Sequence, residues 1–565
     1  MRGADAVLRT LEDEGVRVCF GMPGGAILPI YDAIARGTSV RHVLVRHEQG
    51  AGHMAQGYAR ASGKPGVVFA TSGPGATNLI TPIADAAMDS TPLVCITGQV
   101  RSTLIGTDAF QECPIVSVAA PLVKSARQVR DAQALPHVLR EAFDIATSGR
   151  PGPVLVDIPR DVQESGLEFA WSKTSSPGAI AAEALDPVAI ATAAELICEA
   201  RSPILYVGGG AQRGRGPEQV RRLAELMRIP VVTTLLGKGS FPETHELAFG
   251  CPGMHGSKWA NWALNKADLV LAVGARFDDR VTGRVDDFAP DAKVVHFEAD
   301  PKQINKIRRA DVPVRGDLAI SVGQVVSTLE SHPNALPRSE DWVKKLAGWR
   351  ERFPLRYDRR SPNLKPQAVL EELRDLAGQL ADVSWTTGVG QHQMWAMQYL
   401  VCDRPGSFIT SGGHGTMGFG LPAAIGAKAA RPSSTVICVD GDGSFQMTAQ
   451  EIATSVAEGL PVIVVIINNG YLGMVEQWQS IFYEDRLSEV DLTNSMPDYA
   501  AVARGYGALG YTVESLPQLQ AALVEALERG QTAVLDVHVD PGEPCYPMIP
   551  PNTAAVDVLE WPGST

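Results

Sequence analysis

Short apolar runs alternate with amphipathic stretches along the whole chain. The runs have the length of single strands and are apolar at consecutive positions, which is typical of parallel strands covered by helices on both faces. We expect strands at His42–Arg46, Gly66–Thr71, Pro92–Thr97, Pro153–Ile158, Ile204–Val207, Leu269–Val273, Lys293–Phe297, Thr435–Val439 and Val462–Ile467. The pattern therefore predicts an α/β fold of mostly parallel sheets flanked by helices.

Polar stretches divide the chain into three parts. Trp171–Pro187 is rich in Ser, Ala, Pro and Gly, Ser331–Asp341 is polar, and a further break falls at Ser361–Pro366. A chain of 565 residues is long enough for about three domains. We expect these domains at residues 1–170, 188–332 and 362–550.

The first and third parts share one layout. In each, a helical stretch rich in small residues leads to a strand that ends in a glycine turn, Gly73-Pro74-Gly75 or Gly441-Asp442-Gly443. A second helical stretch follows, and a proline at similar spacing, Pro92 or Pro461, precedes the next strand. We interpret the likeness as an ancient duplication; the alternative is the chance similarity of any two βαβ units.

Composition and charge narrow the classes of function. The net charge is −13, from 63 acidic and 50 basic residues, and no long basic run occurs. A nucleic-acid or anionic-membrane surface is therefore not expected. The 8 cysteines form no C-x-x-C pair, and Cys95 and Cys438 lie in apolar runs, which predicts reduced thiols in a cytoplasmic protein. We expect neither a signal peptide nor a membrane span.

Two strand ends of the third part carry oxygen ligands. Asp442 follows one strand, and Asn469 follows the next. Because parallel strands of a βαβ unit end at the same edge of the sheet, both side chains can meet there and hold Mg²⁺. Gly441 and Gly443 let the backbone approach a diphosphate. The alternative is an ordinary glycine turn and an Asn-Asn loop.

In the first part, Glu48 follows a strand and begins a Gly/Ala-rich helical stretch. A carboxylate at this position ordinarily offsets the helix dipole. The neighbouring segments Gly21–Ala26 and Thr71–Asn78 are, however, too rich in glycine to be an ordinary surface, and they are typical of loops that approach a ligand closely.

These residues belong to a set of motifs that runs from about residue 3 to residue 555. The set comprises FGMPGGAILPIYDAI, RHEQGAGHMAQGYARASGKPG, TSGPGATN, GTDAFQE, GMHG, GARFDDRVTG and GMVEQWQ, together with the Gly441-Asp442-Gly443 and Asn468-Asn469 pair. The combination resembles the catalytic large subunits of the acetolactate synthase (acetohydroxyacid synthase) family, which depend on thiamine diphosphate.

The resemblance implies two thiamine-diphosphate-binding domains that flank a Rossmann-like FAD-binding domain. It implies the decarboxylation of pyruvate and transfer of the hydroxyethyl unit to a second 2-oxo acid, the first common step of branched-chain amino acid biosynthesis. It also implies the cofactors thiamine diphosphate, Mg²⁺ and FAD, a homodimer or homotetramer with active sites between chains, and a small regulatory subunit. The alternatives are another thiamine/FAD enzyme, such as a pyruvate oxidase or sulfoacetaldehyde acetyltransferase, or a catalytically silent paralogue.

The resemblance also assigns site residues. Glu48 contacts the pyrimidine ring of the cofactor, Arg280 holds the acceptor carboxylate, and Trp478 shapes the acceptor pocket. Further residues at the reacting centre are Gly25 and Gln111, with Phe110, Met254 and Met474 beside Trp478. Those near thiamine diphosphate are Glu48, Pro74, Asn78, Gly388, Val389, Gln391, His392, Gly415, Met417, Gly441, Asp442, Gly443, Ser444, Asn469, Tyr471, Leu472, Gly473 and Met474. Those that hold Mg²⁺ are Asp442, Asn469 and the main-chain carbonyl of Tyr471.

The second part indicates a nucleotide site more weakly. Gly208-Gly209-Gly210 follows a strand but is not a G-x-G-x-x-G fingerprint, and Glu298 at a strand end either binds a ribose or caps a helix. By resemblance, FAD lies near Gly208, Gly209, Gly210, Thr234, Leu235, Met254, His255, Gly256, Gly274, Arg276, Asp278, Arg280, Val281, Glu298 and Asp317.

The chain departs from the family pattern at two arginines. Arg160 stands where the family commonly has Lys, and Arg101 stands where susceptible plant enzymes have Pro. We expect Arg101 to weaken sulfonylurea binding, because a bulky charged side chain narrows an apolar entrance.

Overall fold

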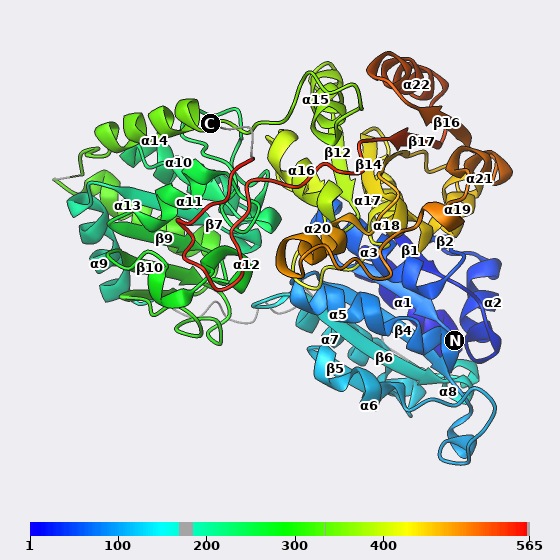
Figure 1. The fold of residues 1–565 in the computed structure, drawn as a ribbon. Coiled ribbons are helices and arrows are strands. Elements are labelled where there is room, and N and C mark those ends of the chain that lie inside the picture. Colours follow the sequence, from blue (N-terminus) through cyan, green and yellow to red (C-terminus); the bar gives the residue numbers. More distant parts are fainter. Residues whose placement is uncertain (169–184, 334, 562–565) are drawn as a thin grey trace.

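The computed structural model describes residues 1–168, 185–333 and 335–561. Most of the linker expected at Trp171–Pro187 lies outside these residues. The expected α/β class is confirmed: three parallel sheets, each flanked by helices, form three bodies joined along the chain (Figure 1). Among the described helices, none combines the length and apolarity that crossing a membrane requires. All eight cysteines are free thiols.

The N-terminal domain is built on a six-stranded sheet of order β2-β1-β3-β4-β6-β5. Its strands are β1 (Val18–Gly21), β2 (Arg41–Leu44), β3 (Gly66–Ala70), β4 (Leu93–Gln99), β5 (Ser125–Gln128) and β6 (Pro153–Pro159). Its helices are α1 (Gly3–Asp13), α2 (Leu28–Arg36), α3 (Glu48–Ser62), α4 (Pro74–Thr77), α5 (Ile80–Met88), α6 (Ile115–Ala119), α7 (Leu135–Thr147) and α8 (Arg160–Glu164).

The central domain has a five-stranded sheet of order β11-β10-β9-β7-β8. Its strands are β7 (Pro203–Val207), β8 (Val231–Thr233), β9 (Leu269–Val273), β10 (Lys293–Glu298) and β11 (Val312–Arg315). Its helices are α9 (Pro187–Glu199), α10 (Gly216–Met227), α11 (Lys258–Asn265), α12 (Asp279–Thr282), α13 (Leu318–Ser331) and α14 (Glu340–Arg352). Helix α14 lies beyond the expected boundary at residue 332, yet it packs on this domain through Trp342 and Leu346.

The C-terminal domain has a second six-stranded sheet, of order β13-β12-β14-β15-β17-β16. Its strands are β12 (Val383–Thr387), β13 (Phe408–Ile409), β14 (Thr435–Gly441), β15 (Ile463–Asn468), β16 (Leu509–Val513) and β17 (Ala533–His538). Its helices are α15 (Pro366–Ala377), α16 (Gln391–Tyr399), α17 (Gly420–Ala430), α18 (Asp442–Gln446), α19 (Ile452–Ala457), α20 (Gly473–Phe482), α21 (Tyr499–Gly505) and α22 (Leu516–Arg529). The strand order repeats that of the N-terminal sheet position by position, so the expected common layout of the two parts is confirmed.

Helices α3 and α17 join the N- and C-terminal domains into one core. A single cluster of buried apolar residues contains one face of each six-stranded sheet and both helices between them. The helices touch backbone to backbone: a Cβ on Gly57 would lie 2.1 Å from the carbonyl oxygen of Ala423, and one on Gly426 would lie 1.8 Å from that of Met54. Glycine is therefore required at both crossing points.

A chain segment after β17 returns to the central domain and lies across it (Figure 1). The backbone N–H of Ile549 donates to the Met254 carbonyl at 2.8 Å, and the Arg284 N–H donates to the Thr553 carbonyl at 3.1 Å. Gln477 of α20 donates to the Cys545 carbonyl at 3.3 Å. The segment thus connects α20 with the part of the central domain that carries Met254 and Arg280.

The helix crossing yields a stability prediction. Gly426→Ala is expected to lower the free energy of unfolding by about 1–3 kcal/mol, because the added methyl group overlaps the α3 backbone. The matched control is Gly348→Ala in α14, where a Cβ meets open space; it is expected to stabilise by about 0.5–1 kcal/mol through helix propensity. Denaturant unfolding measures both, and equal effects of the two substitutions would contradict the close crossing.

Candidate functional site

A cavity lies at the carboxyl edge of the C-terminal sheet. It is lined by residues that follow β12, β14 and β15, and by Met417: Val389, Gly390, Gln391, His392, Trp395, Met417, Gly441, Asp442, Gly443, Ser444, Ile467, Asn469, Tyr471, Leu472, Gly473, Met474 and Val475. The residues of this domain expected near thiamine diphosphate therefore meet in one cavity, except Gly388 and Gly415, which lie next to lining residues. Carboxyl ends of parallel strands are where open α/β sheets bind ligands.

Asp442 is the charged centre of the cavity. It is the first residue of α18. Its carboxylate accepts hydrogen bonds from the backbone N–H of Gly443 at 2.9 Å and of Gly470 at 2.8 Å. Asp442 is 2% exposed, and burial raises its pKa to about 6 despite these bonds. A cation at this position would compensate the buried charge.

The donor set around Asp442 fits Mg²⁺ held together with a phosphate. Asn469 follows β15 on the adjacent strand; its Oδ1 accepts from the Tyr471 N–H, and its Nδ2 donates to Gln391 Oε1, both at 3.2 Å. Asp442, Asn469 and the Tyr471 carbonyl offer only hard oxygens and a single carboxylate, and Mg²⁺ with such a set takes phosphate oxygens as its remaining ligands. Among the described residues, no group of three or more His, Cys, Asp or Glu side chains could hold a metal.

Two buried titratable side chains, Asp440 and His392, lie next to the glycine turn. Asp440, directly before the glycine turn, is fully buried, and burial raises its pKa to about 7. His392 Nε2 lies 3.5 Å from Asp440 Oδ1, and burial lowers the pKa of His392 to about 3. A Cβ on Gly388 would lie 1.8 Å from Asp440 Oδ1, and one on Gly441 would lie 2.6 Å from His392 Nδ1. Neither side chain supplies positive charge, so an anion in the cavity would have to be neutralised by a metal and by backbone amides.

The N-terminal domain assembles a second group of expected residues around Glu48. Glu48 begins α3 and is 7% exposed; Asn78 Nδ2 donates to its Oε2 at 2.9 Å. A Cβ on Gly75 would lie 3.1 Å from Glu48 Oε1, so the segment that begins at Pro74 closes over the carboxylate. Glu48 does not line the cavity of its own chain.

Gln111 and Gly25 lie in the same region. Gln111 has a φ of 60°, and a Cβ on Gly73 would lie 2.9 Å from its Cβ. Gly25 precedes Ala26, whose N–H donates to Thr71 Oγ1 at 3.2 Å. The adjoining Phe110 is 88% exposed, on a segment after β4 that projects from the domain (Figure 1). This side chain is therefore available to another surface and does not line the cavity.

The residues expected to contact the acceptor lie together at the join of the central and C-terminal domains. The Arg280 guanidinium lies 5.8 Å from the centre of the Trp478 ring, and its Nη1 is 3.9 Å from Met254 Sδ. Arg280 also pairs with Asp279 at 3.5 Å, but its side chain remains 60% exposed. A surface ion pair is thus present, and it leaves much of the guanidinium accessible to a ligand.

In the central domain, the glycine turns meet at the carboxyl edge of the sheet. A Cβ on Gly208 would lie 2.1 Å from the Gly274 oxygen, and one on Gly210 would lie 2.9 Å from the Gly274 Cα. Close backbone packing thus requires these glycines with or without a nucleotide. Glu298 ends β10, is buried with a raised pKa, and accepts from the Asp300 N–H at 2.9 Å.

Other residues expected near the flavin have structural contacts. Thr234 Oγ1 accepts from the Gly237 N–H, and Asp278 and Asp317 cap α12 and α13. His255 is buried with a pKa lowered to about 4, and its Nδ1 lies 3.1 Å from the Cys545 carbonyl oxygen. Leu235 packs against the C-terminal core. The remaining members of the set, Gly209, Gly256, Arg276 and Val281, lie on the same segments.

Two arginines at this edge were not expected from the sequence. Arg150, in the turn before β6 of the N-terminal domain, pairs with Asp300 at 3.7 Å, and burial lowers its pKa. Burial also lowers the pKa of Arg213 to about 10. With Arg276, whose charge lowers the Arg150 pKa further, they concentrate positive charge where a dinucleotide would lie. The only sequence signal for Arg150 is a positively charged residue within a Gly-Arg-Pro turn.

The two departures from the family pattern share one partner. Glu164 of α8 pairs with the Arg160 Nε at 2.9 Å and also with Arg101. Both guanidinium groups are thus held by a neighbouring carboxylate. The effect of Arg101 on sulfonylurea binding stays a prediction.

Comparison with known proteins identifies all three domains. Residues 1–118 match the thiamine pyrophosphate enzyme N-terminal TPP binding domain, residues 190–325 match the central domain, and residues 388–537 match the C-terminal TPP binding domain. The chain is 47% identical to the acetolactate synthase large subunit of Corynebacterium glutamicum, over 99% of this chain and 90% of the relative. It is 49% identical to an acetolactate synthase of Mycobacterium bovis (98% and 90%) and 45% identical to the isozyme 3 large subunit of Escherichia coli K12 (97% and 96%).

The buried carboxyl of Asp442 predicts a pH-dependent stability. Since its folded pKa is about 6 and its ordinary value is 3.8, the folded state keeps a proton that the unfolded state releases. Stability therefore falls as the pH rises between these values, by at most roughly 3 kcal/mol. In the metal-free protein, Asp442→Asn removes this loss, so its unfolding temperature should gain on that of the wild type from about pH 4 to about pH 7.

Calorimetric scans across this pH range measure the difference. The exposed Asp375 provides the control, since Asp375→Asn removes a carboxylate outside the cavity. A difference between Asp442→Asn and wild type that stays constant with pH would contradict the prediction.

Proposed function

The chain belongs to the acetolactate synthase family of thiamine pyrophosphate enzymes, and we propose that it decarboxylates pyruvate and transfers the two-carbon unit to a second 2-oxo acid. Pyruvate as acceptor gives 2-acetolactate, and 2-oxobutanoate gives 2-aceto-2-hydroxybutanoate. The observation that carries the proposal is the cavity in which Asp442, Asn469 and the glycine turn meet, within a chain similar to these enzymes over nearly its full length.

The cofactors in this proposal are thiamine diphosphate, Mg²⁺ and FAD. Asp442, Asn469 and the Tyr471 carbonyl would hold Mg²⁺ on the diphosphate, with the amides that begin α16 and α20 beside it. FAD would lie at the carboxyl edge of the central sheet, where Arg150, Arg213 and Arg276 supply positive charge. Bound thiamine diphosphate supplies an electron sink for cleavage of the carbon–carbon bond.

Glu48 is the proton-transfer group of the proposal. Asn78 occupies its Oε2, so Oε1 is the atom expected to exchange a proton with the pyrimidine ring. Burial of the carboxylate excludes competing water and strengthens this hydrogen bond. Glu48 begins a helix whose far end is anchored in the shared core, so its position is held by packing.

Arg280 and Trp478 form the acceptor site in this proposal. A guanidinium fork suits a 2-oxo acid carboxylate, because two parallel N–H donors match its two oxygens. The Trp478 ring, 5.8 Å from the Arg280 guanidinium carbon, would present an apolar face to the acceptor's alkyl group. Met254 and Met474 would form part of the same apolar wall and adjust to the shape of the acceptor.

We place each active site between two copies of the chain, in a homodimer or homotetramer. The cavity is lined by the C-terminal domain alone, and Glu48 of the same chain lies elsewhere; a second copy would supply Glu48, with Gln111 and Phe110. The designation of relatives as large subunits points to a smaller regulatory partner, which we include in the proposal. The free thiols fit a reducing compartment such as the cytoplasm.

Loss of the Glu48 proton-transfer group tests the activity. With pyruvate, thiamine diphosphate, Mg²⁺ and FAD, the wild type is expected to form acetolactate, measured as acetoin after acid treatment. Glu48→Gln should lower the rate at least about a hundredfold, because the amide cannot exchange the proton. Glu141→Gln, on the exposed face of α7, is the control. No product from the wild type, or full activity of Glu48→Gln, would refute the proposal.

A mixture of two inactive chains tests the shared site. Glu48→Gln and Asp442→Asn chains, produced together with different tags, are expected to recover about a quarter of wild-type activity, since half of random pairs are mixed and each mixed pair has one intact site. Each variant alone should stay inactive. A mixture as inactive as its components would show that Glu48 and Asp442 of one chain serve the same site.

A further inference from the structure

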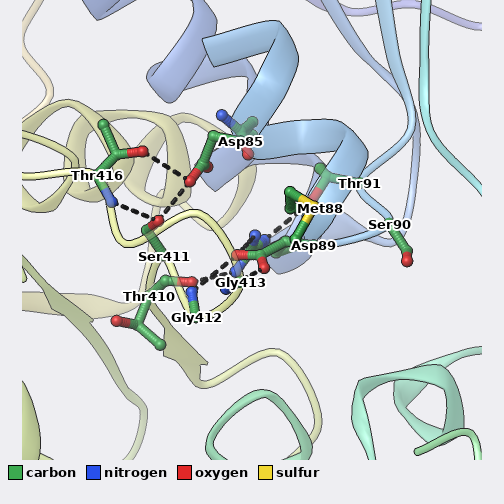
Figure 2. Close-up of polar contacts among 12 residues, drawn as sticks. Asp85, Met88, Asp89, Ser90, Thr91, Thr410, Ser411, Gly412, Gly413 and Thr416 are labelled. Atoms are coloured by element: carbon green, nitrogen blue, oxygen red, sulfur yellow. Dashed lines mark hydrogen bonds and ion pairs between the residues drawn. The ribbon is translucent and has the colours of Figure 1, made fainter. Parts of the chain in front are cut away.

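The N-terminal domain of the same chain holds the loop that carries Met417 into the cavity. This loop, residues 410–419, joins β13 to α17. The backbone N–H groups of Gly412 and Gly413 donate to Asp89 Oδ2 and Oδ1, at 2.9 and 2.6 Å. Figure 2 shows Asp89 and Asp85, both from the α5 region, pointing at the loop from one side.

Asp85 holds the other end of the loop. The hydroxyls of Ser411 and Thr416 both donate to Asp85 Oδ1, the second at 3.0 Å. The Thr416 N–H donates in turn to Ser411 Oγ at 2.8 Å, which closes the loop on itself. Met417 is the next residue, so the position of its side chain depends on the conformation that these bonds fix.

Two glycines of the loop, Gly412 and Gly413, approach both neighbouring domains closely. A Cβ on Gly413 would lie 2.7 Å from Asp89 Oδ1, and one on Gly412 would lie 2.8 Å from Leu236 Cγ of the central domain. The glycine pair therefore contacts an α5 carboxylate on one side and the central domain on the other, with no space for side chains at these contacts.

The loop in turn supplies hydrogen-bond donors to the two buried carboxylates. Asp85 is fully buried and the Asp89 side chain has no exposure. Arg60 of α3 donates to Asp89 Oδ2 at 2.8 Å and also to the Thr410 carbonyl. Buried carboxylates are costly unless hydrogen bonds compensate them. Displacement of the loop would remove most of these bonds at once.

The opposite end of the same segment touches Glu48. Asn78, which donates to Glu48 Oε2, ends α4 and lies two residues before α5 begins. The segment from Asn78 to Asp89 therefore contacts Glu48 at its start and the Met417 loop at its end.

We propose that Asp85 and Asp89 are positioning residues that hold the Met417 loop in its cofactor-binding conformation. The inference rests on the proposed function, in which Glu48 and Met417 of one chain serve different sites. Each N-terminal domain then acts on two sites: it gives Glu48 to one, and through Asp85 and Asp89 it fixes the loop of the other.

Uniform variants test the positioning role. Asp85→Asn and Asp89→Asn keep side-chain volume, and Thr416→Val removes one hydroxyl while leaving both carboxylates. In the cofactor-free protein, amide hydrogen exchange at Gly412, Gly413 and Thr416 should accelerate. The dissociation constant of thiamine diphosphate with Mg²⁺, by calorimetry, should rise at least about tenfold, since charge-assisted hydrogen bonds are lost.

Two readouts separate positioning from general damage. At saturating cofactor, kcat and the KM for pyruvate should return toward wild-type values, and the exposed control Asp375→Asn should change nothing. If Thr416→Val, which leaves Asp85 its hydrogen bond from Ser411 and Asp89 all of its donors, and both Asn variants bind thiamine diphosphate as the wild type does, the proposal is overturned. Loss of kcat that excess cofactor cannot restore would also overturn it.

Mixed chains test which site is affected. In the Glu48→Gln and Asp442→Asn mixture, the recovered site takes Met417 from the Glu48→Gln chain. Asp89→Asn should therefore raise its cofactor requirement only when placed on that chain. An equal effect from either chain, or an effect only from the Asp442→Asn chain, would overturn the proposal. If the parent mixture recovers no activity, the shared site fails, while exchange and calorimetry on uniform variants still decide the role of Asp85 and Asp89.

Discussion

The close crossing of α3 and α17 is the contact on which both halves of the site depend. Each helix begins next to site residues: Glu48 is the first residue of α3, and the Met417 loop leads into α17. Because Gly57 and Gly426 allow the two backbones to touch, one apolar core holds two sheets in a fixed relation. The positions of Glu48, the proposed proton-transfer group, and of the Met417 loop are thus consequences of core packing.

Burial of carboxylates is the main electrostatic cost in this region, and the chain compensates it differently at each position. Asp89 has a guanidinium and two amides as partners, whereas Asp442 has two amides, and in the proposed function a metal would compensate the rest of its charge. Asp440, directly before the glycine turn, has a pKa raised to about 7 by burial, above the value of about 6 for Asp442. Asp442 is therefore the more readily ionised of the two carboxyl groups at the glycine turn.

The amino-acid pattern was informative where structure follows from local periodicity. Runs apolar at every position became the central strands β3, β4, β9, β14 and β15. Most strands that were not expected, including β5, β8, β11, β13 and β16, lie at sheet edges. Strands β8 and β13 are buried but only three and two residues long, and β5, β11 and β16 are partly exposed, so none of them has the long continuous apolar run on which the prediction relied.

The site likewise contains features that follow from local sequence pattern and features that do not. Asp442 and Asn469 could be paired from sequence because adjacent parallel strands bring their ends together, and both line one cavity. Asp85 and Asp89 could not be paired with the Met417 loop from sequence, because the loop residues that they contact lie more than 320 residues away in another domain. No periodicity within either segment reports such a contact; it depends on how the domains meet.

Arg150 has a consequence for how the domains can be recombined. It belongs to the N-terminal domain, yet its guanidinium reaches Asp300 at the carboxyl edge of the central sheet and the last turn of α5. The charge at this edge of the central domain therefore depends on a residue of another domain. A chimaera that exchanged the central domain between related enzymes would have to include the turn at residues 148–152, or the carboxyl edge of its sheet would lose a cation that the N-terminal domain contributes.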